Sequence, residues 1–161
     1  MEIDWIWGAA DHGRDGWELI SDQVMGGVST GTLTLEDVAG RRALHMVGEV
    51  SLENDGGFLQ VARDMAPAGA WTGVAVTVLG PPASYNLHLR TTALERPWQS
   101  FRASFDTTGA WQTVNVPFHA LTPHRTRRAF EPERLCRLGL VAIGRAFRAD
   151  LSVARLGLMR D

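Results

Sequence analysis

The sequence predicts an all-β protein: a single-domain sandwich of two sheets, of jelly-roll type. Apolar residues recur with a period of two between turn residues, and helical periodicity is almost absent. The 161 residues contain no repeat, low-complexity segment or interdomain linker. A chain of this length buries roughly two-thirds of its unfolded surface around one core. We therefore expect residues 1–161 to form one domain in which about eight or nine strands enclose that core.

Each expected strand is an alternating run, and turns such as Val38-Ala39-Gly40 and Thr107-Thr108-Gly109 separate the runs. In chain order the strands are Thr32–Glu36, Arg41–Val50, Gly57–Ala62, Gly73–Leu79, Tyr85–Thr92, Gln99–Asp106, Trp111–Val116, Leu135–Ile143 and Leu151–Met159. Residues 118–134 are expected to be irregular, with a short helical turn. The apolar positions predict a core of Trp17, Met25, Phe58, Val76, Leu87, Phe105, Trp111, Leu138 and Leu140.

Composition excludes several classes of function. All 16 basic residues are arginine, so no lysine is available for a phosphate-binding loop or a Schiff base. A net charge of −2 argues against nucleic-acid binding. Cys136 is the only cysteine, which excludes an intramolecular disulfide and indicates a reducing compartment, so we expect a cytoplasmic protein. His119 and His124 do not have the spacing of a helical zinc pair, and neither a metal nor another cofactor is expected.

No targeting or membrane segment is expected. The N-terminal run Met1-Glu2-Ile3-Asp4-Trp5 carries acidic residues where a targeting peptide carries basic ones. Residues 65–89 lack charged side chains, but prolines and glycines interrupt the stretch well short of a membrane helix. The chain is therefore not expected to span a membrane.

The run Gly27-Val28-Ser29-Thr30-Gly31 has the G-x-S-x-G spelling of a hydrolase nucleophile elbow. An elbow requires a helix after the serine, whereas Thr32–Glu36 alternates as a strand does. The pattern therefore favours a structural loop over a catalytic serine, and no enzymatic activity is expected.

In this structural interpretation, Asp22 accepts hydrogen bonds from nearby backbone N–H groups, and Ser29 bonds locally. Gly26 and Gly27 adopt positive φ, and Met25 packs into the core beside Trp17. The alternative is that the free N–H groups of the loop and the Ser29 hydroxyl form part of a ligand or partner site.

Polar residues alternate with the apolar residues of two expected strands. Asn86, His88 and Arg90 lie on one strand, and Arg102 and Ser104 lie on the next. If these strands pair, the five side chains share the outer face of one sheet, with Trp98 at its edge as a possible stacking platform. Such a face is either simply solvated or a binding surface. The run His124-Arg125-Thr126-Arg127-Arg128 is either a solvated basic loop or a segment that attracts an acidic partner.

One sequence pattern points to a known family. Trp17 precedes a D-x-V-M-G-G-x-S element at residues 22–29. In the same order follow Gly56-Gly57-Phe58, Tyr85, Phe105 before Gly109, and Trp111-Gln112-Thr113-Val114 leading to Pro117-Phe118. This pattern, spread over residues 17–159, resembles the complex I intermediate-associated protein 30 family.

The resemblance implies a galactose-binding-like jelly roll. In mitochondrial members it also implies a role in assembling respiratory NADH:ubiquinone oxidoreductase without becoming part of the finished enzyme. Two features depart from the pattern: Val28 stands where a polar or basic residue is expected, and a mitochondrial targeting segment is missing, as in a bacterial relative.

We therefore expect a non-catalytic binding protein, an assembly or chaperone-like factor. Its expected partner is a protein, such as a membrane respiratory complex or its assembly intermediate. The alternative is a carbohydrate-binding module of jelly-roll type, because a fold alone does not decide function. The candidate contact residues are Asp22, Gly26, Gly27, Ser29, Asn86, His88, Arg90, Trp98 and Arg102.

Overall fold

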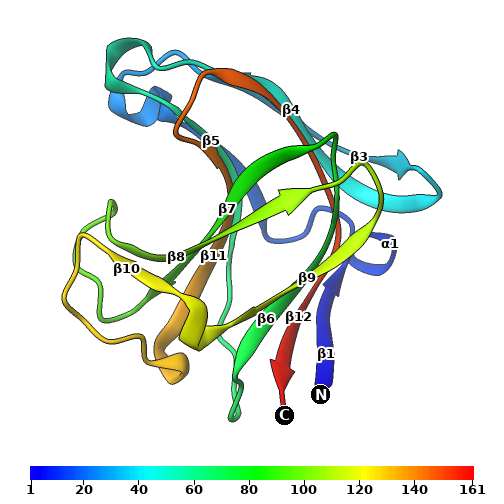
Figure 1. Ribbon diagram of the computed structural model, residues 1–161. Helices are drawn as coiled ribbons and strands as arrows, with labels where there is room; N and C mark the ends of the chain where they lie inside the picture. Colours follow the sequence, from blue (N-terminus) through cyan, green and yellow to red (C-terminus); the bar gives the residue numbers. More distant parts are fainter.

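Two antiparallel sheets, each with six strands, pack face to face in the computed structural model, which describes residues 1–161 (Figure 1). The first sheet has the order β3-β4-β12-β6-β9, with β1 also paired to β12. The second sheet has the order β10-β8-β7-β11-β5-β2. The all-β sandwich that the alternating pattern predicts is confirmed.

The first sheet consists of β1 (Glu2–Gly8), β3 (Thr30–Val38), β4 (Arg41–Val50), β6 (Gly73–Leu79), β9 (Gln112–Pro117) and β12 (Phe147–Arg160). The second consists of β2 (Trp17–Ser21), β5 (Phe58–Asp64), β7 (Ala83–Thr91), β8 (Ser100–Thr107), β10 (Thr122–His124) and β11 (Leu135–Ile143). The helical elements are α1 (Ala9–His12) and the 3-10 helices η1 (Asp22–Met25), η2 (Glu53–Asp55), η3 (Phe118–Ala120) and η4 (Pro132–Arg134). None of these helices is long and apolar enough to cross a membrane.

The longest strand, β12, organises the first sheet. One edge of β12 pairs with β6, and the other edge pairs with β4 over residues 147–153 and then with β1 over residues 155–160. The pairing with β1 brings the first and last strands together, with Glu2 opposite Arg160. The two chain ends therefore lie side by side (Figure 1).

The core fills the space between the sheets. Leu87, Leu138 and Leu140 from the second sheet and Val76 from the first are completely buried, as the alternation predicts. The buried Tyr85 places its hydroxyl between the backbone groups of Asp150, accepting from its N–H at 3.1 Å and donating to its carbonyl at 3.3 Å. The phenol oxygen is thus satisfied inside the apolar layer.

Three members of the predicted core lie elsewhere. Phe58 and Trp111 are half-buried. The prediction for Met25 is wrong, because its side chain is 65% exposed. It lies at the end of η1, directly before the turn at Gly26, and does not pack beside Trp17. The ring of Trp17 instead meets the ring of Trp7 edge-on, with 5.1 Å between the ring centroids.

Three strands were not expected from the sequence. In β1 a bulge between Trp5 and Trp7 interrupts the alternation. The strand β2 has only five residues, and β10 has three and contains Pro123. Proline is tolerated in β10 because this strand lies at the edge of its sheet.

Candidate functional site

The glycine-rich loop connects β2 to β3 and begins with the short helix η1. The side chain of Ser21 caps this helix by accepting a hydrogen bond from the N–H of Gln23 at 3.2 Å. Gly26 closes it with a φ of 87°, in the left-handed region that favours glycine. The predicted positive φ of Gly26 is confirmed.

Asp22 is the centre of this loop, and its side chain is completely buried. One carboxylate oxygen accepts the N–H of Ser29 at 2.9 Å. The other accepts the Ser29 hydroxyl at 2.5 Å and the N–H groups of Gly57 at 2.6 Å and Phe58 at 3.2 Å. The Ser29 oxygen in turn accepts the N–H of Ser51 at 2.9 Å. One aspartate thus joins the segment after β2 to the start of β3 and the start of β5.

The hydrogen bonds decide the charge of this carboxylate. Burial on its own raises the pKa of Asp22, but the bonds from Ser29, Gly57 and Phe58 together outweigh it and hold the pKa below its usual range. Asp22 is therefore ionised at neutral pH, and its charge is used entirely within the protein.

Two glycines allow the backbone to approach this carboxylate. A Cβ atom on Gly27 would lie 2.4 Å from the Asp22 side-chain carbon Cγ, and a Cβ atom on Gly56 would lie 2.6 Å from Oδ2. The predicted positive φ of Gly27 is wrong, since only Gly26 of this pair has one. Gly27 is required for space rather than for its backbone angle.

This geometry gives the G-x-S-x-G run a structural role. Ser29 is completely buried, its hydroxyl is bonded to Asp22, and the strand β3 follows it instead of a helix. A nucleophile elbow presents its serine at the surface. Of the four loop residues considered for a site, Asp22, Gly27 and Ser29 are buried, and Gly26 alone is exposed.

The predicted polar face of the second sheet is brought together. The strands β7 and β8 pair so that Asn86 lies opposite Ser104 and His88 lies opposite Arg102. These side chains point away from the core, because Leu87 and Leu89 on the same strand are completely buried. The expected neighbour relation of the two strands is therefore confirmed.

Arg90 also lies on β7, but its side chain is hydrogen-bonded within the protein. Its Nη1 donates to the carbonyl oxygens of Arg96 at 2.9 Å and Pro97 at 3.1 Å, and also to that of Gln99. Arg90 therefore anchors the loop between β7 and β8. Trp98 lies on this loop and is 54% exposed, with the Arg96 guanidinium 5.9 Å from its ring centroid.

The short strand β10 brings His124, and Arg125 directly after it, to the face. It pairs with β8 so that His124 lies opposite Ser100, beside Arg102. Burial, together with the charges of Arg102 and Arg125, lowers the pKa of His124. Burial, followed by the charges of Arg102 and His124, lowers the pKa of His88 to about 3. After burial, the positive charge of Arg102 thus favours the neutral form of both histidines.

No acidic side chain neutralises this region. Nε of Arg102 donates to the Ser100 hydroxyl at 2.8 Å. None of the ion pairs of the chain includes Arg102, Arg125 or Arg127. We call this surface the cationic face: the guanidinium groups of Arg102 and Arg125 carry its charge, and His88 and His124 lie beside them.

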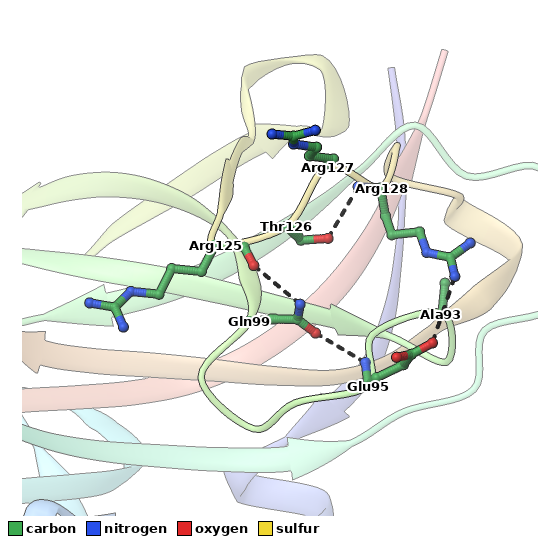
Figure 2. Close-up of a pocket in the computed structure, with 7 residues that line it drawn as sticks. All are labelled: Ala93, Glu95, Gln99, Arg125, Thr126, Arg127 and Arg128. Atoms are coloured by element: carbon green, nitrogen blue, oxygen red, sulfur yellow. Dashed lines mark hydrogen bonds and ion pairs between the residues drawn. The ribbon is translucent and has the colours of Figure 1, made fainter.

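A hollow of about 630 Å³ lies beside the cationic face, between the β7–β8 loop and the loop after β10 (Figure 2). Gln99 joins the two loops: its side chain donates to the carbonyl of Arg125 at 3.1 Å and accepts the N–H of Glu95 at 3.0 Å. Glu95 also lies 3.8 Å from Arg128. In Figure 2 the side chain of Arg125 extends away from the hollow, and its backbone has a φ of 56°. The Gln99 bond holds this unusual conformation in place.

The sequence indicates only part of the cationic face and of the hollow beside it. The basic run 124–128 was visible, but the position of His124 beside Arg102 depends on a strand of three residues, which is too short for a periodic signal. The bridging role of Gln99 has no sequence pattern at all.

The sequence of the chain matches the model of one protein family. The model of the complex I intermediate-associated protein 30 family matches residues 8–152. The chain belongs to this family. In this member of the family, the D-x-V-M-G-G-x-S element is the loop that Asp22 holds. No curated protein matches the chain in sequence.

Solved structures confirm the jelly roll for this family member. A family 11 carbohydrate-binding module from Clostridium thermocellum, in complex with a β-1,3-1,4-mixed-linked tetrasaccharide, is similar with a TM-score of 0.78 and 9% identity. The match covers 98% of this chain and 95% of that one. A family 30 module of a cellulosomal cellulase from the same organism is similar with a TM-score of 0.56 and 14% identity, covering 81% of this chain and 83% of that one. At such identities the likeness concerns the fold alone.

Proposed function

We propose that this protein is a non-catalytic binding protein that assists the assembly of a larger protein complex, a role that its membership of the complex I intermediate-associated protein 30 family supports. The observation that supports this proposal best is the cationic face. Its partner is a protein, and a membrane respiratory complex or its assembly intermediate is the first candidate. The buried position of Ser29 supports binding over hydrolysis.

The chemistry of the cationic face selects an acidic partner. Arginine presents a planar fork of N–H donors that fits a carboxylate with two parallel hydrogen bonds. Arg102 has only its Nε bonded within the protein, to Ser100, which leaves its two terminal nitrogens for a partner. A carboxylate placed beside Arg102 and Arg125 also relieves the repulsion between the two guanidinium groups.

The test is capture of partners from a native lysate by tagged protein, with identification of the captured proteins. We expect subunits of a membrane complex to be recovered with the wild type. Arg102→Ala combined with Arg125→Ala should reduce recovery by roughly fivefold or more, as loss of an interface anchor does. Arg148→Ala is the matched control, because Arg148 is an exposed arginine of the first sheet that pairs with Glu49. Equal recovery by the double variant and the control would contradict the proposal.

Carbohydrate binding is the second candidate, because the fold resembles carbohydrate-binding modules along almost the whole chain. The aromatic residues argue against it. The only tyrosine, Tyr85, is buried. An arginine lies over one ring face of each of the four tryptophans that are not buried, namely Trp5, Trp71, Trp98 and Trp111. The outer face of the second sheet carries neither tryptophan nor tyrosine for a sugar ring to stack on.

A glycan array that includes mixed-linked β-glucan separates the two candidates. Under the assembly proposal we expect no saturable sugar binding. Saturable binding that Trp98→Ala abolishes would favour the carbohydrate module instead, since Trp98 is the only tryptophan more than half exposed.

A further inference from the structure

The loops held by Asp22 expose apolar side chains. Val24 is 74% exposed, Met25 65%, Leu52 51% and Val28 40%. The only other large apolar side chains so exposed are the terminal Met1 and Trp98. We call Val24, Met25, Val28 and Leu52 the apolar tip. A grouping of apolar side chains on one exposed region is unusual for a surface with no contact role.

Two loops that are distant in sequence contribute to the tip. The side-chain amide of Asn54 in η2 donates to the carbonyl of Gly26 at 3.3 Å, and Gly57 donates to Asp22 at 2.6 Å. Leu52 lies against Gly57, since its Cδ2 would be 2.9 Å from a Cβ on that glycine. Figure 1 places both loops at the same end of the sandwich, at upper left.

The buried hydrogen bonds of Asp22 fix the backbone that carries the tip. A backbone already held in place loses little conformational entropy when it binds, so its exposed side chains are effective anchors. Methionine is also enriched at protein interfaces, because its flexible, polarisable side chain adapts to the surface of a partner. The polar residues of the D-x-V-M-G-G-x-S element thus build a rigid support, and its Val24 and Met25 are free to make contacts.

We propose that the apolar tip is a second docking surface, and that it takes an apolar segment of a partner protein flanked by basic residues. The charge around the tip selects this partner. Glu53 and Asp55 are exposed beside Leu52, and neither residues 21–29 nor residues 51–58 contain a basic side chain. The turn after β11 touches the second of these segments through a hydrogen bond from Gly144 to Gly57. The two arginines that follow it are engaged elsewhere: Arg145 lies over the ring of Phe147 at 3.8 Å and Arg148 pairs with Glu49 at 3.1 Å.

The same carboxylates disfavour two other occupants. Contact between the tips of two copies would bring Glu53 and Asp55 of one copy toward those of the other, and like charges in an interface are unfavourable. An anionic membrane surface repels them as well. The inference rests on the proposed binding function, but it concerns a different surface: the tip follows β2, at the opposite edge of the second sheet from β10.

The test uses the full chain and a short, labelled, amphipathic peptide of leucine and lysine as the probe, with fluorescence anisotropy as the measurement. We expect saturable binding by the wild type. Val24→Ser combined with Met25→Ser should weaken it by roughly fivefold or more, as the loss of interface anchors does. Glu53→Gln combined with Asp55→Gln should also weaken it. The Arg102→Ala, Arg125→Ala variant is the matched control and should bind as the wild type does.

Each alternative outcome overturns the inference. Absence of saturable binding, or equal affinity in the Val24, Met25 variant, removes the tip as a docking surface. Equal affinity for a leucine and glutamate peptide removes the charge argument. Self-association or binding to anionic vesicles that the tip variant abolishes would assign the tip to another occupant. Thermal unfolding of both variants checks that the fold is intact. Partner capture through the cationic face is measured separately, so failure of this inference leaves that proposal testable.

Discussion

The glycine-rich loop and the cationic face are opposites in how they place polar and apolar groups. In the loop, the carboxylate of Asp22 and the hydroxyl of Ser29 are buried and bonded, while Val24 and Met25 are exposed. On the cationic face, Leu87 and Leu89 are buried. Arg102 is partly exposed and Arg125 is exposed, and neither forms an ion pair with an acidic side chain. The most recognisable polar residues of this sequence, Asp22 and Ser29, therefore support the fold. The side chains that are free to bind a partner, such as Val24, Met25 and Arg102, belong to different residues.

Removal of the Asp22 carboxylate should destabilise the protein most. Asp22→Ala leaves the N–H groups of Ser29, Gly57 and Phe58 buried without their acceptor. Each unsatisfied buried group is costly, so we expect a loss of about 3 to 5 kcal/mol in the free energy of unfolding. Urea denaturation measures it. A denaturation midpoint equal to that of the wild type would show that the loop does not need this carboxylate.

The next prediction compares two adjacent glycines. Gly27→Ala places a methyl group against Asp22 and should destabilise by roughly 1 to 3 kcal/mol, as overpacking does. Gly26→Ala meets no atom within 4 Å and has only its positive φ to oppose it, so it should cost less, about 1 kcal/mol. Parallel denaturation of the two variants measures the difference. The reverse order would mean that backbone angle, and not space, limits this loop.

A smaller effect is expected on the pH dependence of stability, and it comes from His88 on the cationic face. The pKa of His88, about 3, lies below the value of an unfolded histidine, so the unfolded chain binds more protons. The contribution of His88 to stability is therefore present above about pH 6.5 and is lost as the pH falls toward the folded pKa. His88→Gln, which does not titrate, should make the loss of stability between pH 6.5 and 5 shallower. Identical slopes for the variant and the wild type would argue against a buried neutral imidazole.

The sequence predicted the strands better than the site. The bounds of β4, β6 and β11 agree with the expected runs, because these strands are long and strongly alternating or continuously apolar. The sequence places Met25 in the core, because an apolar residue beside a glycine turn gives no sign of which way it points. Arg90 and Arg102 share the same alternation, yet only the three-dimensional structure shows that Arg90 holds the β7–β8 loop. Contacts between residues distant in sequence, such as Asp22 with Gly57, leave no local pattern.

The pairing of β1 with β12 has a consequence for the connectivity of the molecule. Glu2 lies opposite Arg160, and the two side chains form an ion pair at 2.8 Å. Since adjacent ends permit rearrangement of a chain, a short linker between them should allow a circularly permuted protein that opens at the exposed Ala39–Gly40 turn between β3 and β4. By the same geometry, both ends leave the sandwich at a single place (Figure 1), away from the apolar tip. The fold is thus suited to insertion as a whole unit into a loop of a host protein, with the tip left free.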